Sequence, residues 1–208
     1  MSLKRLAIVF SVALITLVAR ATAQDEEDWE LSGLIGRTFI SKQSIQGVPN
    51  GEVRFGKGLT FEVNYAARMI YRPFWSLYLE LPVAFNLDED LSANTQVPSQ
   101  FRSFFITPAA RFHVFSNAPI SPWVSVGGGF GYFSESSDLL FGSRNPGKTG
   151  TTSGVFQTGL GFDVNAFKNI GFRLEARDFW SGVPQLNVNT GKSRQHNTFV
   201  AGGIVLHF

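Results

Sequence analysis

The sequence has no cysteine, few charged residues and, beyond its first twenty positions, no long apolar run. Without cysteine, the chain cannot be a small secreted domain held by disulfides, nor a lipoprotein anchored through a cysteine behind its leader. No later segment has the roughly 20 consecutive apolar residues of a membrane-spanning helix. A sustained 3.6-residue periodicity is also missing after the leader, which argues against a helical domain. Stability must therefore come from a sheet that closes on itself or from an apolar core.

The N-terminal segment has the three parts of a secretory signal peptide. Lys4 and Arg5 give the positive start, residues 6–19 form an apolar run, and Ala21 and Ala23 form an A-x-A cleavage site. The apolar run is too short to span a bilayer as a helix, and an uncleaved N-terminal anchor is the alternative interpretation. We predict a signal peptide at 1–23, an acidic tail at 24–28 and a single domain at 29–208.

Charge gives no indication of a nucleic-acid partner. The predicted signal peptide holds three of the 18 Lys and Arg residues and none of the 16 Asp and Glu residues. The basic isoelectric point of the whole chain therefore reflects, in part, a segment that export removes. Phe and Gly are both abundant, at 21 residues each, while the mean hydropathy is near neutral. Strands with one lipid-facing side and one polar side produce this composition.

Alternation with period 2 is the main signal in the rest of the chain. It is clearest at 59–72, where Leu59, Phe61, Val63 and Tyr65 begin one apolar face and charged residues occupy the other face. We predict eight strands, at 29–42, 59–72, 75–87, 102–115, 123–133, 153–167, 170–180 and 197–208. We also expect a β-bulge at Pro82, because proline removes a ladder hydrogen bond, and a sharp bend or a bulky neighbour at 127–129, which is Gly-Gly-Gly.

The connections between these strands alternate in length. Four long, polar loops are predicted at 43–57, 88–101, 134–152 and 181–196, and short turns separate the other pairs of strands. Long loops at one end and short turns at the other are typical of barrels that span the bacterial outer membrane. A soluble lipocalin barrel also alternates with period 2, but the G-x-W sequence near the start of such chains is absent here, since Glu27 and Asp28 precede Trp29.

The final strand carries a family resemblance. Gly203, Leu206 and the terminal Phe208 stand where the C-terminal insertion signal of outer-membrane barrels has its glycine and two apolar residues, whereas Ala201 departs from the polar residue common there. The whole domain resembles the small eight-stranded barrels of the OmpA-like and OmpX-like kind, without a periplasmic peptidoglycan-binding domain. The resemblance implies an all-β, closed, antiparallel up-and-down barrel in the cell outer membrane. It also implies a monomer that contacts membrane lipid and lipopolysaccharide and is inserted by the β-barrel assembly machinery.

Tryptophans and charges give two further expectations. Trp29, Trp75, Trp123 and Trp180 fall at predicted strand ends, so we predict that they lie in the two membrane interfaces. The strand faces opposite the apolar ones carry charges that should meet in the lumen. These are Glu62, Arg68, Arg72, Glu80, Arg111, Asp163, Arg173, Glu175 and Arg177. An eight-stranded barrel is just wide enough for side chains to fill, so we expect a charge-plugged lumen, with a narrow gated pore as the alternative.

Catalysis has less support in the sequence. The lipid A deacylase family carries a His-x-Ser pair on one strand face, whereas here His113 and Ser116 are one residue too far apart and fall on opposite faces. His196 is expected in a loop and His207 near the end, without a partner. We therefore predict no catalytic residue, no cofactor and no metal-ligand cluster. The long loops, which contain Ile45, Val48, Leu91, Val97, Leu139, Leu140, Phe141 and Leu186, are either solvated tips or a surface for a ligand.

Overall fold

The computed structural model describes residues 28–116, 118–167 and 169–208. The predicted signal peptide, its cleavage site at Ala21 and Ala23, and most of the acidic tail therefore lie outside the described residues. The described chain forms β-strands, and none of its segments is a helix long and apolar enough to cross a membrane. The strands are β1 (Trp29–Ile40), β2 (Gln43–Ser44), β3 (Glu52–Phe55), β4 (Leu59–Arg72), β5 (Trp75–Ala93), β6 (Gln100–Ile106), β7 (Ala109–Val114), β8 (Ile120–Glu135), β9 (Thr151–Phe167), β10 (Ile170–Gly182) and β11 (Arg194–His207).

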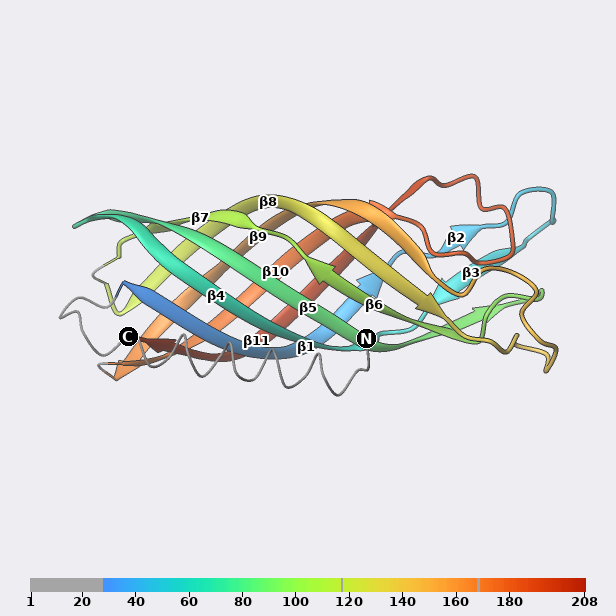
Figure 1. Ribbon diagram of the computed structural model, residues 1–208, viewed down its shortest axis with the longest axis horizontal. Coiled ribbons are helices and arrows are strands. Elements are labelled where there is room, and N and C mark those ends of the chain that lie inside the picture. The colour runs from blue at the N-terminus through green and yellow to red at the C-terminus, as the bar shows by residue number, and fades with distance from the viewer. Residues whose placement is uncertain (1–27, 117, 168) are drawn as a thin grey trace, which may run out of the picture.

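The sheet closes because the first and last strands pair. β1 and β11 run antiparallel from Glu30 opposite His207 to Ile40 opposite Asn197. Backbone hydrogen bonds of 3.0 Å between Trp29 and Phe208, in both directions, extend this seam to the last residue. The other strands each pair with their neighbours in chain order, which leaves no free edge in the barrel wall (Figure 1). The predicted closed antiparallel barrel is confirmed.

Eight strands cross the barrel, because β6 and β7 are two parts of one crossing. Their register against β5 and β8 is the same on both sides of the interruption at Thr107 and Pro108. The predicted bulge at Pro82 is wrong, since the β4–β5 ladder continues through Asn64 opposite Pro82. The interruption lies in the neighbouring strand instead, where Pro108 has no N–H and the Thr107 N–H donates to the Pro82 carbonyl oxygen at 3.3 Å.

The Gly-Gly-Gly segment of β8 packs against this interruption. A Cβ atom on Gly127 would collide with the Pro108 carbonyl oxygen, and one on Gly129 would collide with that of Ile106. β8 itself shows no register shift against β9. The glycines therefore permit a close approach between backbones, without a bulge in β8.

The outer wall of the barrel is apolar. Large side chains on alternate strand positions are exposed around it, among them Ile35, Val63, Leu79, Val124, Leu160, Leu174 and Ile204. These are the positions that the sequence assigned to the lipid-facing side. A water-exposed wall of this kind would be strongly unfavourable, because apolar area in contact with water costs about 25 cal/mol per Å². The barrel wall therefore faces lipid.

One end of the barrel, here called the loop end, extends beyond the wall (Figure 1). β5 continues to Ala93 and pairs with β3, which pairs with β2, so the predicted loops at 43–57 and 88–101 contain strand segments. Apolar loop residues fold inward and hold this extension: Ile45, Val53, Leu91, Val97 and Leu186 are all buried in one cluster. The opposite end, here called the short-turn end, contains the chain terminus Phe208 and the turns between paired strands.

The interior has two layers. At the loop end it is filled by apolar side chains, including Phe101, Phe105, Phe133, Phe179 and Phe199, each at most 2% exposed. Along β10 toward the short-turn end, the inward positions change from Phe179 to Arg177, Glu175 and Arg173. The expectation of a polar lumen is therefore correct for one half only, and the apolar half continues into the folded loops.

Candidate functional site: the charged interior and its polar mouth

Arg177 is the centre of the charged layer. Its guanidinium lies 2.7 Å from the Glu80 carboxylate, 2.8 Å from that of Glu175 and 3.2 Å from that of Glu62. The three acids come from β5, β10 and β4, and all four side chains are at most 2% exposed. A buried charge is tolerated only when it is paired, so this one cation holds three strands of the wall to a common centre.

A second group lies nearer the short-turn end. Arg173 holds Asp163 in a two-bonded contact, with nitrogen–oxygen distances of 2.7 and 2.6 Å, and also contacts Glu30 at 3.2 Å. Arg111 donates to the same Glu30 oxygen and reaches Glu80 at 3.3 Å. Arg111 therefore connects the two groups into one network. Within the described interior this network contains the five carboxylates of Glu30, Glu62, Glu80, Asp163 and Glu175 and the three guanidiniums of Arg111, Arg173 and Arg177.

Trp123 lies inside this network, 2% exposed, and not in the membrane interface. Three guanidiniums surround its indole ring, those of Arg111, Arg173 and Arg177, with ring-centre distances of 5.7, 5.3 and 5.1 Å. Its indole N–H donates to Asp163 at 3.1 Å. The interfacial prediction for Trp123 is wrong, because period 2 places this residue opposite the lipid-facing Val124. An aromatic face is a favourable neighbour for cations that are removed from water.

Two predicted lumen residues lie outside the charged network. Arg68 faces inward, as predicted, but at the short-turn end, where it lines the opening of the interior and pairs with Asp28 at 2.8 Å. Arg72 is exposed and donates to the carbonyl oxygen of Tyr71, so its assignment to the lumen is wrong. The reason is a register shift between Arg68 and Ile70 that changes which face the last residues of β4 present. Glu30 was missed, although its position between the outward Trp29 and Leu31 was the signal that could have found it.

The remaining predicted tryptophans are on the outer wall. Trp29 is stacked on Tyr65 and Trp75 on Phe112, both at the short-turn end. Trp180, at the loop end of β10, is 42% exposed and stacked on His196. His196 was expected in a loop, but it lies in β11, where its Nδ1 atom is 2.5 Å from Asp178.

The residues of the resembled insertion signal line the seam of the barrel. Leu206 is exposed on the outer wall, and Phe208 closes the β1–β11 ladder through its backbone. Gly203 lies where a Cβ atom would collide with the Gly33 carbonyl oxygen, so only glycine permits this approach of the last strand to the first. The structure thus gives these residues roles in closure, and their role as a signal stays a prediction.

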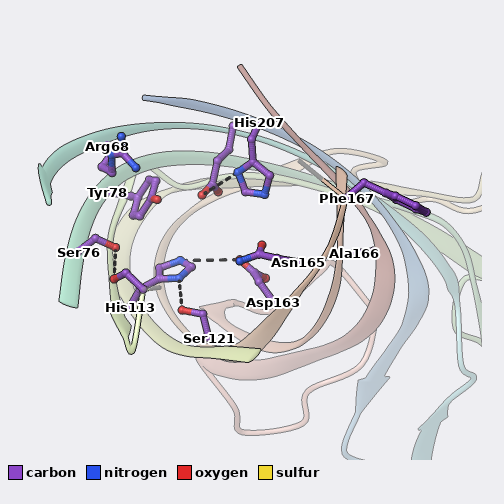
Figure 2. Close-up of a pocket in the computed structure, with 12 residues that line it drawn as sticks. Arg68, Ser76, Tyr78, His113, Ser121, Asp163, Asn165, Ala166, Phe167 and His207 are labelled. Atoms are coloured by element: carbon purple, nitrogen blue, oxygen red, sulfur yellow. Dashed lines mark hydrogen bonds and ion pairs between the residues drawn. The ribbon is translucent and has the colours of Figure 1, made fainter. Parts of the chain in front are cut away.

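A polar cavity of about 440 Å³ opens the interior at the short-turn end, and we call it the mouth. Figure 2 shows His113, His207, Asp163 and Tyr78 around this cavity. These residues belong to β7, β11, β9 and β5. Ser121 bonds to the Nδ1 atom of His113 at 3.1 Å, while the buried Nε2 atom of the same ring has no hydrogen-bond partner. The Nε2 atom of His207 is also buried without a partner.

The mouth brings together residues that the sequence separates widely. Ligand atoms of Glu30, His113 and Asp163 all lie within 4.8 Å of one another, a grouping of potential metal ligands that the sequence did not reveal. The period-2 alternation of side chains places all three residues inside the barrel. It does not give their positions along the barrel axis. Ser116 donates to Ser76 at 2.9 Å. His113 is instead adjacent to Ser121, which the sequence reading did not single out.

No family model and no curated protein matches the sequence. Solved structures do match the fold. Neisserial surface protein A (NspA) superimposes with a TM-score of 0.54 at 16% identity, over 88% of this chain and 98% of the other. OprG of Pseudomonas aeruginosa gives 0.52 at 11% identity, over 87% and 95%. The N-terminal barrel domain of OprF, from the same organism, gives 0.50 at 12%, over 89% and 100%. The fold is that of small outer-membrane barrels, as the sequence resemblance implied.

Proposed function

We propose that this small barrel of the outer-membrane type is a sealed, non-catalytic envelope protein that presents its loop end as a binding surface. The observation that carries the proposal is the filling of the lumen by two consecutive layers. The charged network closes the short-turn half, and phenylalanines that are at most 2% exposed close the loop-end half. An eight-stranded barrel leaves little interior space beyond its side chains, so either layer is sufficient to stop ions.

The loop end supports the surface role. Its apolar side chains pack inward, apart from Val48 and Phe141, which are 44% and 63% exposed. Exposed cations dominate the outside: Arg37, Lys42, Arg54, Lys57, Arg102, Arg144, Lys148, Lys192 and Arg194, against exposed Asp88, Asp90 and Asp138. A basic surface on a preformed scaffold fits an anionic partner, and phosphate groups of lipopolysaccharide are the nearest candidates in the outer membrane.

The proposal includes the steps that the sequence implies. Export would use the signal peptide at 1–23, and the β-barrel assembly machinery would recognise the last strand with Gly203, Leu206 and Phe208. The protein would act as a monomer in the outer membrane, in contact with lipid. The hydrogen bonds of Ser121 support a role without catalysis, since its hydroxyl donates to the Val114 carbonyl oxygen at 3.1 Å and so offers no proton to His113.

A narrow gated pore is the second candidate. The observation that favours it is the mouth, because this open polar cavity adjoins the charged network at Glu30, which pairs with Arg173. The two candidates differ in conductance. We would measure ion current through the refolded protein in a planar lipid bilayer, together with an Arg173→Ala, Arg177→Ala variant.

A silent wild type supports the sealed barrel, and discrete openings in the wild type would establish the pore and overturn it. In the double variant the charged layer is broken, but the apolar layer is intact. We therefore expect the current to stay small. Combining this variant with Phe179→Ala tests the second layer, and a leak that appears only in the combined variant is the expected result.

A further inference from the structure

We propose that the mouth contains a binding site for a divalent transition metal ion of the Zn²⁺ class, with His113, His207, Glu30 and Asp163 as ligands. This site goes beyond the sealed-barrel function and does not depend on it. The four side chains line the mouth and come from β7, β11, β1 and β9, so a bound ion would join four strands. Figure 2 shows His113, His207 and Asp163 around this opening. Imidazole nitrogens combined with carboxylate oxygens are a ligand set typical of zinc.

The hydrogen bonds of His113 determine which of its ring nitrogens carries a proton. The Ser121 hydroxyl has a single proton, and it donates this proton to the Val114 carbonyl oxygen. With the Ser121 proton on the Val114 carbonyl oxygen, the contact of 3.1 Å between Ser121 Oγ and His113 Nδ1 is a bond in which Nδ1–H donates. A neutral ring protonated at Nδ1 has its lone pair at Nε2. Metal-binding histidines are usually held in this way, with the second nitrogen donating to a fixed acceptor.

The lone pair at Nε2 faces an anion. Nε2 lies 3.9 Å from an Asp163 carboxylate oxygen, is buried and has no hydrogen-bond partner. A lone pair and a carboxylate at this distance repel each other unless a cation lies between them. Two ligand atoms on a zinc ion are roughly 3.4 Å apart, given bonds of about 2.0–2.1 Å in tetrahedral geometry. A shift of a few tenths of an ångström would therefore bring both atoms onto one ion.

The second half of the site is another pair of a histidine and a carboxylate, in which the Nδ1 atom of the ring faces the acid. His207 Nδ1 lies 3.8 Å from the Glu30 Oε1 atom, and His207 Nε2 is buried without a partner. Glu30 receives Arg111 and Arg173 on its other oxygen, Oε2, which leaves Oε1 directed toward His207. The two guanidiniums thus orient Glu30 through the oxygen that lies away from His207, as outer-shell partners of metal ligands do. Arg173 also fixes Asp163, through both of its carboxylate oxygens.

The charge of the interior is consistent with a bound dication. The network holds five carboxyl groups and three guanidiniums, so acidic groups are in excess. A cation at the mouth would reduce this excess. A proton on His113 Nε2 is the competing occupant of the position beside Asp163, and the experiment below separates the two.

The experiment is a Zn²⁺ titration of the refolded full barrel in detergent micelles, followed by calorimetry and by the thermal unfolding midpoint. Co²⁺ serves as a spectroscopic probe of the ligand geometry. The chain has three histidines and no cysteine, so His196 on the outer wall provides a matched control. We compare His113→Gln, His207→Ala and His196→Ala, and check that each is folded by circular dichroism.

We expect one Zn²⁺ per barrel and a rise in the unfolding midpoint with Zn²⁺. His113→Gln and His207→Ala should each weaken binding at least about tenfold, the lower bound for loss of even an outer-shell partner. His196→Ala should bind as the wild type does. Absence of saturable binding overturns the proposal and leaves the proton as the occupant. Binding that survives both mouth variants, or that His196→Ala abolishes, also overturns it. His207 is at the rim, so His207→Ala decides the question if His113→Gln does not fold.

Discussion

Replacing Arg177 with alanine gives the most direct test of how the interior is held together. The change removes the one cation that contacts Glu62, Glu80 and Glu175, at 3.2, 2.7 and 2.8 Å. Removal of one partner from a buried ion pair costs about 3–5 kcal/mol, because the remaining charge has lost its counterion. Here Glu62 and Glu175 both lose their counterion, and Glu80 keeps only Arg111 at 3.3 Å, so we expect a loss at the upper end of this range.

The assay is urea unfolding of the protein refolded into lipid vesicles, followed by tryptophan fluorescence. Arg177→Met separates charge from volume, because methionine fills much of the space without supplying a cation. Arg72→Ala is the matched control: this arginine is exposed at a turn, and its loss should change the free energy of unfolding by less than about 0.5 kcal/mol.

A double variant tests whether repulsion among the carboxylates causes the loss of stability. If repulsion among the orphaned carboxylates causes the loss, adding Glu62→Gln to Arg177→Met should recover part of it, since one of the three charges is then neutral. The reasoning is refuted if Arg177→Met is no less stable than Arg72→Ala, or if Glu62→Gln makes the Arg177→Met protein less stable still.

Three further predictions concern other parts of the chain. Leu79→Arg, on the lipid-facing wall, should cost about 2–4 kcal/mol near the bilayer midplane in the same assay, and an unchanged unfolding free energy would contradict lipid contact there. Phe208→Ala should lower the amount of assembled barrel in outer-membrane fractions, and normal amounts would argue against the insertion signal. Burial raises the pKa of Glu135, the last residue of β8 at the loop end, so the folded state binds this proton more tightly than the unfolded state does. Stability from this group is therefore lost as pH rises through the folded pKa, and Glu135→Gln should gain stability relative to the wild type with rising pH; an advantage that shrinks instead would show the sign to be wrong.

Alternation predicted the barrel wall because each lipid-facing residue meets the same environment, whatever its neighbours are. The inner faces of β4, β5 and β10 followed for the same reason, and Arg173, Glu175 and Arg177 are inside as predicted from parity. Trp123 lies at a strand start, where aromatic residues often mark the membrane interface, but the alternation of side chains turns it inward. The alternation, and not the position along the strand, determines where this residue lies.

Other features depend on contacts that no local pattern encodes. β2 and β3 are too short to alternate visibly, and they exist because β5 continues past the wall and offers them an edge. The cluster of Glu30, His113 and Asp163 depends on the stagger between β1, β7 and β9, which parity does not give. The exposed Arg72 results from a one-residue shift in the β4–β5 ladder.

The two-layered interior also determines where function can be sought. The apolar layer joins the barrel to its loops, because Phe101, Leu91 and Leu186 belong to one buried cluster. Opening a path through that end would require separating this cluster, with a loss of about 1.5–3 kcal/mol for each large side chain exposed. The loop end is therefore better suited to a fixed surface than to a gate. At the opposite end the mouth is polar, open and lined by unpaired imidazole nitrogens, so small ligands can enter there without any change in the fold.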